Sequence, residues 1–403
     1  SERDDRDDVL SSPCLGQCDF GSAAFIQRAG EPDRIIAPTT ADAVEAALAG
    51  EETPARTPVR PLRSIDIQDR IGIVDPTSLA SYREHGGYSA LERALELGAD
   101  IVIEEVTTSS LRGRGGAAFP TGVKWRGAAD SDSDTRYLIC NADESEPGTF
   151  KDRTIMEGDP FSVIEAMTIA GFAIGAEQGY LYVRGEYPDA AGALQNAIDQ
   201  ATEARLLGDD ILGEGVTFDI EIRQGQGAYI CGEETALFNS IEGFRGEPRQ
   251  KPPFPTEAGL FGEPTVVNNV ETLVNVLDIV LLGGAAFAEV GTSDSTGTRL
   301  FCISGAIDRP GVYEVEFGTS LRELLDFAGG PPDDLTTILL GGAAGSFVGP
   351  DMLDLPLTFE DSRAEGVSLG SGVVVVYDSS TDMRAVARRI ARFFRDESCG
   401  QCV

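Results

Sequence analysis

The middle of the chain alternates between two hydrophobic periodicities. Apolar runs at residues 137–140 and 180–184, and a segment at 218–222 that alternates apolar with acidic residues, predict three strands. Residues 160–174 carry helical spacing, and within 194–201 apolar residues recur at i, i+3, i+4 and i+7. The order strand, helix, strand, helix, strand predicts an α/β fold in which helices cover a parallel or mixed sheet.

Similar patterns occur nearer the two ends. Residues 301–330 predict two short strands about a Pro-Gly turn and then a helix, and residues 385–394 predict a basic amphipathic helix. The simpler alternative for the latter is a surface helix whose arginines neutralise an acidic protein. Residues 35–50 predict a strand and then a helix, and the proline-rich segment 51–62 predicts a linker.

Two polar motifs directly follow predicted strands. They are NADE at 141–144 and GQGAYICGEE at 225–234. Ligands of open α/β sheets bind beyond the carboxyl ends of the strands. We therefore expect both motifs to face a ligand.

A glycine-rich stretch precedes these strands. Residues 111–125 read LRGRGGAAFPTGVKW and contain four glycines, two arginines, one of only three lysines and the only tryptophan. Glycines offer bare backbone N–H groups to phosphate oxygens, and the basic side chains supply positive charge. The stretch predicts a phosphorylated cofactor. A tight strand-to-helix turn is the alternative, because short glycine-rich matches are common by chance.

The composition is that of a large folded protein. The chain has 403 residues, 41% of them hydrophobic, which is enough for several domains with packed cores. No apolar run is long enough to span a membrane, and Ser1 opens an acidic segment rather than a signal peptide. We expect a cytoplasmic protein, in which the lone histidine, His85, is structural.

The formal net charge of −35 is spread along the whole length. Such a field repels phosphate backbones and anionic lipids, so a nucleic-acid partner is not expected. An acidic excess with almost no lysine resembles halophilic adaptation; the alternative is an acidic partner-binding face. We favour a high-salt cytoplasm, where screening shortens the repulsion to about 3 Å.

Six motifs occur in order between about residue 62 and the C-terminus. They are LRGRGGAAFPTGVKW (111–125), NADESEPGTFKDR (141–153), GAYICGEETAL (227–237), KPPFP (251–255), PTVVNNVET (264–272) and SCGQC (398–402). Together they resemble the NADH-oxidising flavoprotein subunit of respiratory complex I, which is similar to the diaphorase subunits of NAD-linked hydrogenases and formate dehydrogenases.

The resemblance implies FMN as cofactor. NADH gives up two electrons as hydride, whereas iron–sulfur clusters accept one at a time, so a flavin has to stand between them. The residues that the motifs place around FMN are Gly113, Arg114, Gly115, Gly116, Lys124, Asn141, Asp143, Glu144, Tyr229, Gly232, Glu233, Asn268, Asn269 and Thr272.

The same motifs imply a site for NADH. Its residues are Phe119, Glu146, Tyr229, Glu234, Lys251 and Phe254, and the catalytic assignments are Glu144, Glu146 and Glu234. Aromatic rings offer adenine a stacking surface, and carboxylates bind ribose hydroxyls or the carboxamide. The alternatives are core packing for the phenylalanines and helix capping for the glutamates, although capping and binding are compatible.

One position departs from the family pattern. Many members carry an aromatic residue two positions after the motif tryptophan, and here that position is Gly127. Either Phe254 alone stacks on adenine, or the affinity for the nucleotide is lower than in the members that carry the aromatic residue.

The seven cysteines, without a secretory signal, are expected in metal or redox roles. The resemblance assigns Cys399 and Cys402 to a [4Fe–4S] cluster, and Cys14 and Cys18 to the [2Fe–2S] site of a thioredoxin-like partner subunit. Each cluster takes four ligands, so both sets are incomplete in this chain. We expect a fusion of two subunits clipped at both ends; the alternative for Cys14 and Cys18 is two incidental cysteines.

The implied architecture is a Rossmann-like FMN- and NADH-binding domain, a β-grasp (SLBB) domain and the start of a helical bundle. The expected boundaries are 1–52 for the remnant of the thioredoxin-like domain, 53–63 for the linker, 64–292 for the α/β domain, 293–378 for the SLBB domain and 379–403 for the truncated helical iron–sulfur domain.

The implied function is NADH oxidation by hydride transfer to FMN, followed by one-electron transfer to iron–sulfur clusters. The expected partners are other subunits of an electron-transfer complex, which would hold the chain peripherally on the cytoplasmic side of a membrane. A diaphorase subunit of a hydrogenase or formate dehydrogenase is one alternative, with the same chemistry and another acceptor. A non-catalytic scaffold with the same fold is the other, and flavin absorbance would distinguish it.

The acidic surface predicts a salt requirement. At low ionic strength the carboxylates repel one another over tens of ångströms, so the folded state should be destabilised. We expect the melting temperature to rise between dilute buffer and molar KCl, as measured by differential scanning calorimetry. A melting temperature that does not rise would contradict the halophilic interpretation.

Overall fold

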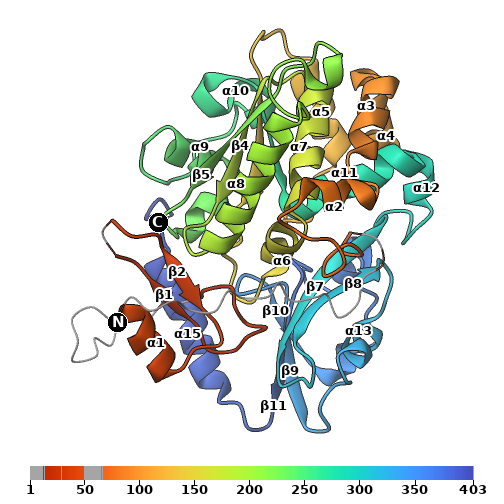
Figure 1. The fold of residues 1–403 in the computed structure, drawn as a ribbon. Coiled ribbons are helices and arrows are strands. Elements are labelled where there is room, and N and C mark those ends of the chain that lie inside the picture. The colour runs from red at the N-terminus through yellow and green to blue at the C-terminus, as the bar shows by residue number, and fades with distance from the viewer. Residues whose placement is uncertain (1–11, 13, 29, 50–64, 66, 403) are drawn as a thin grey trace.

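The computed structural model describes residues 12, 14–28, 30–49, 65 and 67–402. Figure 1 shows a large α/β part, a second part built on another sheet, and a small N-terminal piece. The predicted linker, residues 53–63, lies outside the described residues. The expected domain boundaries therefore stay predictions.

A four-stranded sheet forms the centre of the α/β part. Its order is β5 (Asp219–Gln224), β4 (Gln178–Val183), β3 (Tyr137–Ala142), β6 (Thr265–Asn269), and all neighbours pair in parallel. The chain moves outward from β3 through β4 to β5, and then returns to add β6 on the other side of β3. This reversal lies between β3 and β6, which is where open α/β sheets form a ligand crevice.

Helices surround this sheet, as the sequence predicted. The principal ones are α7 (Pro160–Ile174), α8 (Pro188–Glu203) and α11 (Val270–Leu282). α7 begins with a proline, whose missing N–H costs nothing in a first turn, and ends at Gly175 with φ +72°. The α/β prediction and both predicted helices are confirmed.

Shorter helices complete the α/β part. They are α2 (Leu79–Glu84), α3 (Ser89–Leu97), α4 (Ala99–Thr108), α5 (Thr121–Ala129), α6 (Lys151–Gly158), α9 (Glu234–Ile241), α10 (Pro255–Ala258) and α12 (Gly284–Ala288), with single turns η1 (Ile211–Gly213), η2 (Tyr229–Gly232) and η3 (Leu260–Gly262).

A five-stranded mixed sheet follows along the chain. Its order is β10 (Ser346–Val348), β9 (Leu335–Leu340), β11 (Val373–Asp378), β7 (Thr298–Gly305), β8 (Gly311–Glu316). β7 and β8 pair antiparallel and lead into α13 (Leu321–Phe327), so the predicted two strands and helix are confirmed. A turn η4 (Pro350–Met352) and α14 (Phe359–Ala364) complete this part, which has its own buried core.

The N-terminal piece pairs β1 (Ala24–Ile26) with β2 (Arg34–Ile36) and continues into α1 (Ala41–Leu48). Two buried arginines of the α/β part hold the segment before β1. Arg153 donates to both carboxylate oxygens of Asp19 at 2.7 Å and to the carbonyl of Gly16 at 3.0 Å. Arg184 donates to the carbonyl of Cys14 at 3.0 Å. The segment is therefore docked on the α/β part by charge-assisted bonds.

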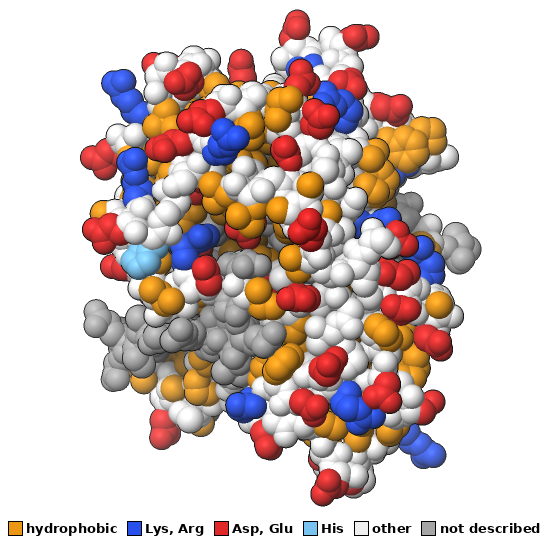
Figure 2. All heavy atoms as spheres, turned by 90° about the vertical axis from the view of Figure 1, so that its right-hand side faces the viewer, with side chains coloured by type: hydrophobic (Ala, Val, Ile, Leu, Met, Phe, Trp, Pro, Cys, Tyr) orange, Lys and Arg blue, Asp and Glu red, His pale blue; other side chains and the backbone are white. Residues whose placement is uncertain are grey.

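The predicted basic helix is α15 (Met383–Asp396), which carries five exposed arginines. No helix within the described part of the chain has the length and apolar character that a membrane span requires. On the face shown in Figure 2, acidic side chains are scattered among other residues rather than gathered in one patch. His85 is exposed and ends α2, where its Nδ1 lies 2.8 Å from the carbonyl of Ser81.

Candidate functional site

A cavity of about 420 Å³ lies where the carboxyl ends of β3 and β6 meet loops of the second sheet. This volume falls within the range of small-molecule sites. Predicted site residues that line it are Gly115, Gly116, Asn141, Asp143, Glu144, Glu146, Tyr229, Gly232, Glu233 and Asn269. The structure thus brings together residues from four of the six sequence motifs.

Glycines leave parts of the cavity walls without side chains. A Cβ at Gly115 would lie 3.0 Å from Cβ of Asn269, closer than side chains normally pack. Gly116 has φ +120° and faces the carbonyl of Gly370, 3.7 Å from where its Cβ would stand. A Cβ at Gly232 would stand 3.5 Å from Oδ2 of Asp143. Backbone from three separate segments is therefore open to a ligand.

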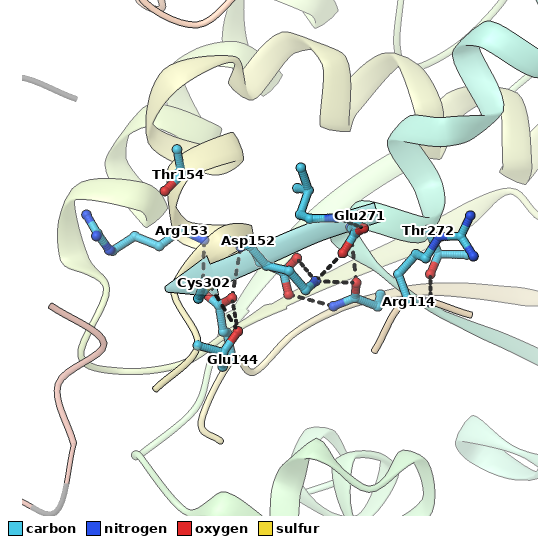
Figure 3. A network of polar contacts seen from close by, with 12 residues as sticks. Arg114, Glu144, Asp152, Arg153, Thr154, Glu271, Thr272 and Cys302 are labelled. Carbon is cyan, nitrogen blue, oxygen red and sulfur yellow. Dashed lines mark hydrogen bonds and ion pairs between the residues drawn. The ribbon is translucent and has the colours of Figure 1, made fainter. Parts of the chain in front are cut away.

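The buried ammonium group of Lys151 lines the cavity, and Figure 3 labels two of the carboxylates around it, Asp152 and Glu271. Lys151 contacts carboxylate oxygens of Asp152 at 2.7 Å and Glu271 at 2.8 Å, and donates to Oδ1 of Asn269 at 3.2 Å. Burial opposes its charge, but the two carboxylates raise the pKa of Lys151 above its usual value. The other oxygen of Glu271 accepts the N–H of Leu300 in β7, so the same network fixes the second sheet.

Asp143 is a buried carboxyl group in the wall of the cavity. Its Oδ1 has no hydrogen-bond partner, whereas Oδ2 accepts the hydroxyl of Ser145 at 3.1 Å. Burial raises the pKa of Asp143 to about 7, against the opposing charge of Arg184. An unpartnered buried oxygen that lines a cavity is suited to accept a donor from a ligand.

The glutamates that were assigned catalytic roles have different surroundings. Glu144 accepts the N–H groups of Asp152 and Arg153 at 2.9 and 3.0 Å, which caps α6, and also the hydroxyl groups of Thr149 and Tyr187. Burial raises the pKa of Glu144 to about 7. The capping alternative is confirmed for Glu144, whose two oxygens are both engaged inside the protein.

In the second motif the capping residue is Glu233, not Glu234. Glu233 accepts the N–H groups of Thr235 and Ala236 at 2.9 and 3.0 Å, at the start of α9. Glu234 instead pairs with Lys251, whose Nζ lies 2.6 Å from Oε1 of Glu234 and 3.1 Å from Oε1 of Glu233. Glu234 lies in the first turn of the helix, where the dipole stabilises a carboxylate, but the hydrogen bonds to the helix N–H groups come from Glu233.

Glu146 caps no helix and reaches across the cavity. Its Oε2 accepts the hydroxyl of Tyr229 at 2.5 Å, and its Oε1 accepts the N–H of Ala344 at 3.1 Å. Gly342 has φ +98°, and a Cβ there would stand 2.5 Å from Cγ of Glu146. Glu146 thus joins the α/β part to the second sheet at the mouth of the cavity.

The second sheet supplies one wall that sequence reasoning missed. Its contributions are Gly341, Ala344, Gly345, Ser368, Gly370 and Ser371. Two glycine- and serine-rich segments carry them, GGAAG at 341–345 and SLGSG at 368–372. Their composition is similar to that of the first glycine loop, and this was the available signal.

Other predicted cofactor residues lie behind the glycine loop. The N–H of Arg114 donates to Oγ1 of Thr272 at 2.8 Å, and its buried guanidinium bonds the carbonyl of Thr296 at 2.7 Å. Oδ1 of Asn268 accepts the indole N–H of Trp125 at 2.9 Å. These contacts hold the glycine loop in place. Gly113, whose N–H donates to the carbonyl of Phe119, belongs to the same turn.

The predicted nucleotide residues Phe119 and Phe254 are exposed, at 50% and 55%. Core packing is therefore wrong for both. Nζ of Lys124 lies 5.9 Å from the ring centre of Phe119 and donates to the carbonyl of Val267. A Cβ at Gly127 would stand 3.7 Å from Thr256 of α10, the helix that Phe254 directly precedes. The position that departs from the family pattern is therefore close to Phe254.

The seven cysteines are free thiols. A hydrogen bond from Cys18 lowers the pKa of Cys14 to about 6, which places these two thiols together. Cys399 is partly buried and Cys402 is exposed. Among the described residues, no group of three or more potential ligands is placed to hold a metal. Neither pair therefore completes the four-thiolate set of an iron–sulfur cluster on these residues alone.

Comparisons with known proteins agree with the two-part structure. Residues 106–278 match the Nuo51 FMN-binding domain, and residues 300–343 match the SLBB domain. The F 2 subunit of NADH-quinone oxidoreductase in Rhizobium meliloti (strain 1021) is 48% identical over 345 residues, which are 85% of this chain and 80% of that protein. The F subunit of the Escherichia coli (strain K12) NADH-quinone oxidoreductase is 46% identical over 332 residues, 81% of this chain and 75% of that protein.

Hydrogenase subunits are similar as well. The HndC subunit of the NADP-reducing hydrogenase of Solidesulfovibrio fructosivorans is 46% identical over 334 residues, 82% of this chain and 68% of that protein. A chain in the crystal structure of an NAD⁺-reducing [NiFe]-hydrogenase in the H₂-reduced state superposes with a TM-score of 0.82 at 35% identity. The match covers 97% of this chain but 64% of the hydrogenase chain.

The raised pKa of Asp143 predicts a pH dependence of stability. Its pKa is about 7 in the folded ligand-free protein and 3.8 as the ordinary value, so the folded state holds an extra proton between these values. Its stabilising contribution is full below about pH 4 and is lost as pH rises through 7, at most about 1.4 kcal/mol per pH unit. Asp143→Asn should flatten this slope in denaturant titrations, whereas Asp132→Asn, on the surface, should preserve it. An unchanged slope in Asp143→Asn would show that Asp143 is ionised throughout.

Proposed function

The chain belongs to the family that contains the F subunits of NADH-quinone oxidoreductases and the diaphorase subunits of hydrogenases, and on this premise we propose that it oxidises NADH by hydride transfer to FMN held in the glycine-lined cavity. The observation that carries the proposal is the cavity itself, at the β3 and β6 switch point. Glycine backbone from separate segments lines it together with the buried ammonium group of Lys151.

The residues present fit FMN. Gly115 and Gly116 have no side chain that would keep the backbone away from the phosphate and the ring. At Gly115 a side chain would also press on Asn269. Lys151 lines the cavity with its ammonium already paired to Asp152 and Glu271, so the backbone N–H groups of the glycine loop would be the main donors to the phosphate. The unpartnered Oδ1 of Asp143 would accept an N–H of the ring. When bound, FMN accepts hydride and passes electrons on one at a time.

The nucleotide would enter from the side of Phe119 and Phe254. Their exposed rings would stack on adenine, and the cluster of Lys251 with Glu233 and Glu234 would bind the ribose hydroxyls. Hydride moves directly between stacked rings, so no general base is needed and positioning is the main task of the protein. Glu146 with Tyr229 holds the mouth of the cavity at the place where the nicotinamide must arrive.

A diaphorase subunit of a hydrogenase is the second candidate. The hydrogenase chain covers 97% of this chain, against 85% for the Rhizobium relative, so it also covers most of the region before the α/β part. Both candidates share the NADH-to-FMN chemistry and differ in the acceptor. Mass spectrometry of the subunits that co-purify with the native protein would distinguish them.

The iron–sulfur clusters belong to the proposal as acceptors. Cys399 with Cys402, and Cys14 with Cys18, would each contribute two thiolates, and further thiolates must complete each set. The last step to a partner subunit is proposed on the basis of the family alone.

Gly115→Val should abolish FMN binding. The branched side chain would fill the space beside Asn269, where a Cβ alone already lies 3.0 Å away. We expect the flavin content of the purified variant to fall at least tenfold by absorbance at 450 nm. Gly192→Val is the matched control, because Gly192 lies on α8 with no heavy atom within 4 Å of its added Cβ. Stoichiometric FMN in Gly115→Val would overturn the assignment of this loop.

Phe254→Ala and Glu234→Gln should weaken NADH binding while FMN stays in place. Loss of one stacked ring costs about 1 to 3 kcal/mol, so KM for NADH should rise about five- to 150-fold in ferricyanide reduction. Phe347→Ala, at an exposed ring on the second sheet, is the control and should leave KM unchanged. Wild-type KM in both site variants would place the nucleotide elsewhere.

A further inference from the structure

Tyr229 belongs to two parts of the molecule at once. Its hydroxyl lies in the cavity and donates to Oε2 of Glu146 at 2.5 Å. Its backbone N–H points the other way and donates to Oε2 of Glu397 at 2.9 Å. Glu397 is the residue that ends α15, 168 positions further along the chain. A single residue thus links the cavity to the C-terminal helix.

The last turns of α15 also pack on the ring of Tyr229. Phe393 lies edge-on to it with ring centres 4.9 Å apart, and Phe394 follows at 6.5 Å. Phe393 is 5% exposed, and with Val386 it is one of two buried residues among the fourteen of α15. Because an edge-to-face pair adds to the burial of apolar area, this contact is a main attachment of the helix.

The residues after α15 continue the same attachment. Arg245 donates to the carbonyl of Cys399 at 2.7 Å, and the side-chain amide of Gln401 donates to Glu247 at 2.6 Å. A second cavity of about 360 Å³ lies here, lined by Cys231, Glu397 and Cys399 among others. Ile230 lines both cavities, so the single turn η2 is the wall between them.

We propose that Glu397 and Phe393 are positioning residues for the nucleotide site. They hold η2 so that the hydroxyl of Tyr229 meets Glu146, and binding of a nicotinamide nucleotide and the ordering of residues 397–402 then favour each other. Such coupling is reciprocal by necessity. The part of this proposal that concerns nucleotide binding rests on the proposed function. The hold of Glu397 and Phe393 on η2, which we call the clamp, is a property of the chain alone.

The ligand-free test is hydrogen exchange. In Glu397→Ala the N–H of Tyr229 loses its acceptor, so exchange over residues 227–232 should become faster than in the wild type. Glu397→Gln keeps a carbonyl oxygen that accepts the same N–H and should largely restore the protection. Arg395→Ala is the control, because Arg395 lies on the same turn and pairs with Asp396. Exchange in Glu397→Ala that matches the wild type would overturn the clamp.

The second test measures nucleotide binding to the FMN-loaded protein. By isothermal titration, Kd for NAD⁺ should rise about five- to tenfold in Glu397→Ala and in Phe393→Ala, with Kd for FMN unchanged. In the reverse direction, saturating NAD⁺ should slow exchange over residues 397–402 in the wild type and not in Tyr229→Phe. Wild-type Kd in both α15 variants would overturn the positioning role even if the clamp exists. If the wild type itself binds no NAD⁺, the proposed function fails, and the ligand-free exchange still decides the clamp.

Discussion

The site depends on one buried ammonium group. Lys151 is 1% exposed and pairs with Asp152 of α6 and Glu271 of α11, two buried carboxylates that would otherwise lack this counter-charge. Through Glu271 the same charge fixes β7, the first strand of the second sheet. The floor of the cavity, the helices around it and the attachment of the neighbouring part are therefore set together. A compact ammonium suits this place, because a planar guanidinium would need more room.

Once the two sheets are fixed, the space between them stays open because glycines there have no side chains to fill it. Gly115 and Gly116 clear one wall, and the segments 341–345 and 368–372 clear the opposite one. Glu146 then links the two parts by bonding Tyr229 of one and Ala344 of the other. The rigid arrangement suits a reaction whose main requirement is that two rings be held face to face. It also explains why residues far apart in the chain act on one ligand, since each sheet contributes only half of the walls.

Local patterns were reliable for elements that are buried along most of their length. The predicted helix at 160–174 is α7 with the same bounds, and the predicted strand at 137–140 is β3, which extends by two residues to Ala142. Helix capping was harder, because several glutamates compete for the same N–H groups. Glu144 caps α6 and Glu233 caps α9, while Glu146, closer to α6 in sequence than Glu144, bonds Tyr229 instead. Sequence spacing does not reveal which carboxylate the packed chain directs to which donor.

The sequence by itself determined the α/β class, the order of the two sheet-forming parts and the motifs that gather at the carboxyl ends of the strands. These depend on periodicity and on residue type, which are local properties. Only the tertiary structure decided that Arg114 and Thr272 support the glycine loop from below, and that segments 341–345 and 368–372 line the cavity. It alone decided that Glu397 holds Tyr229. Contacts between residues more than 150 positions apart depend on how the two sheets pack, and no local pattern in the chain encodes that packing.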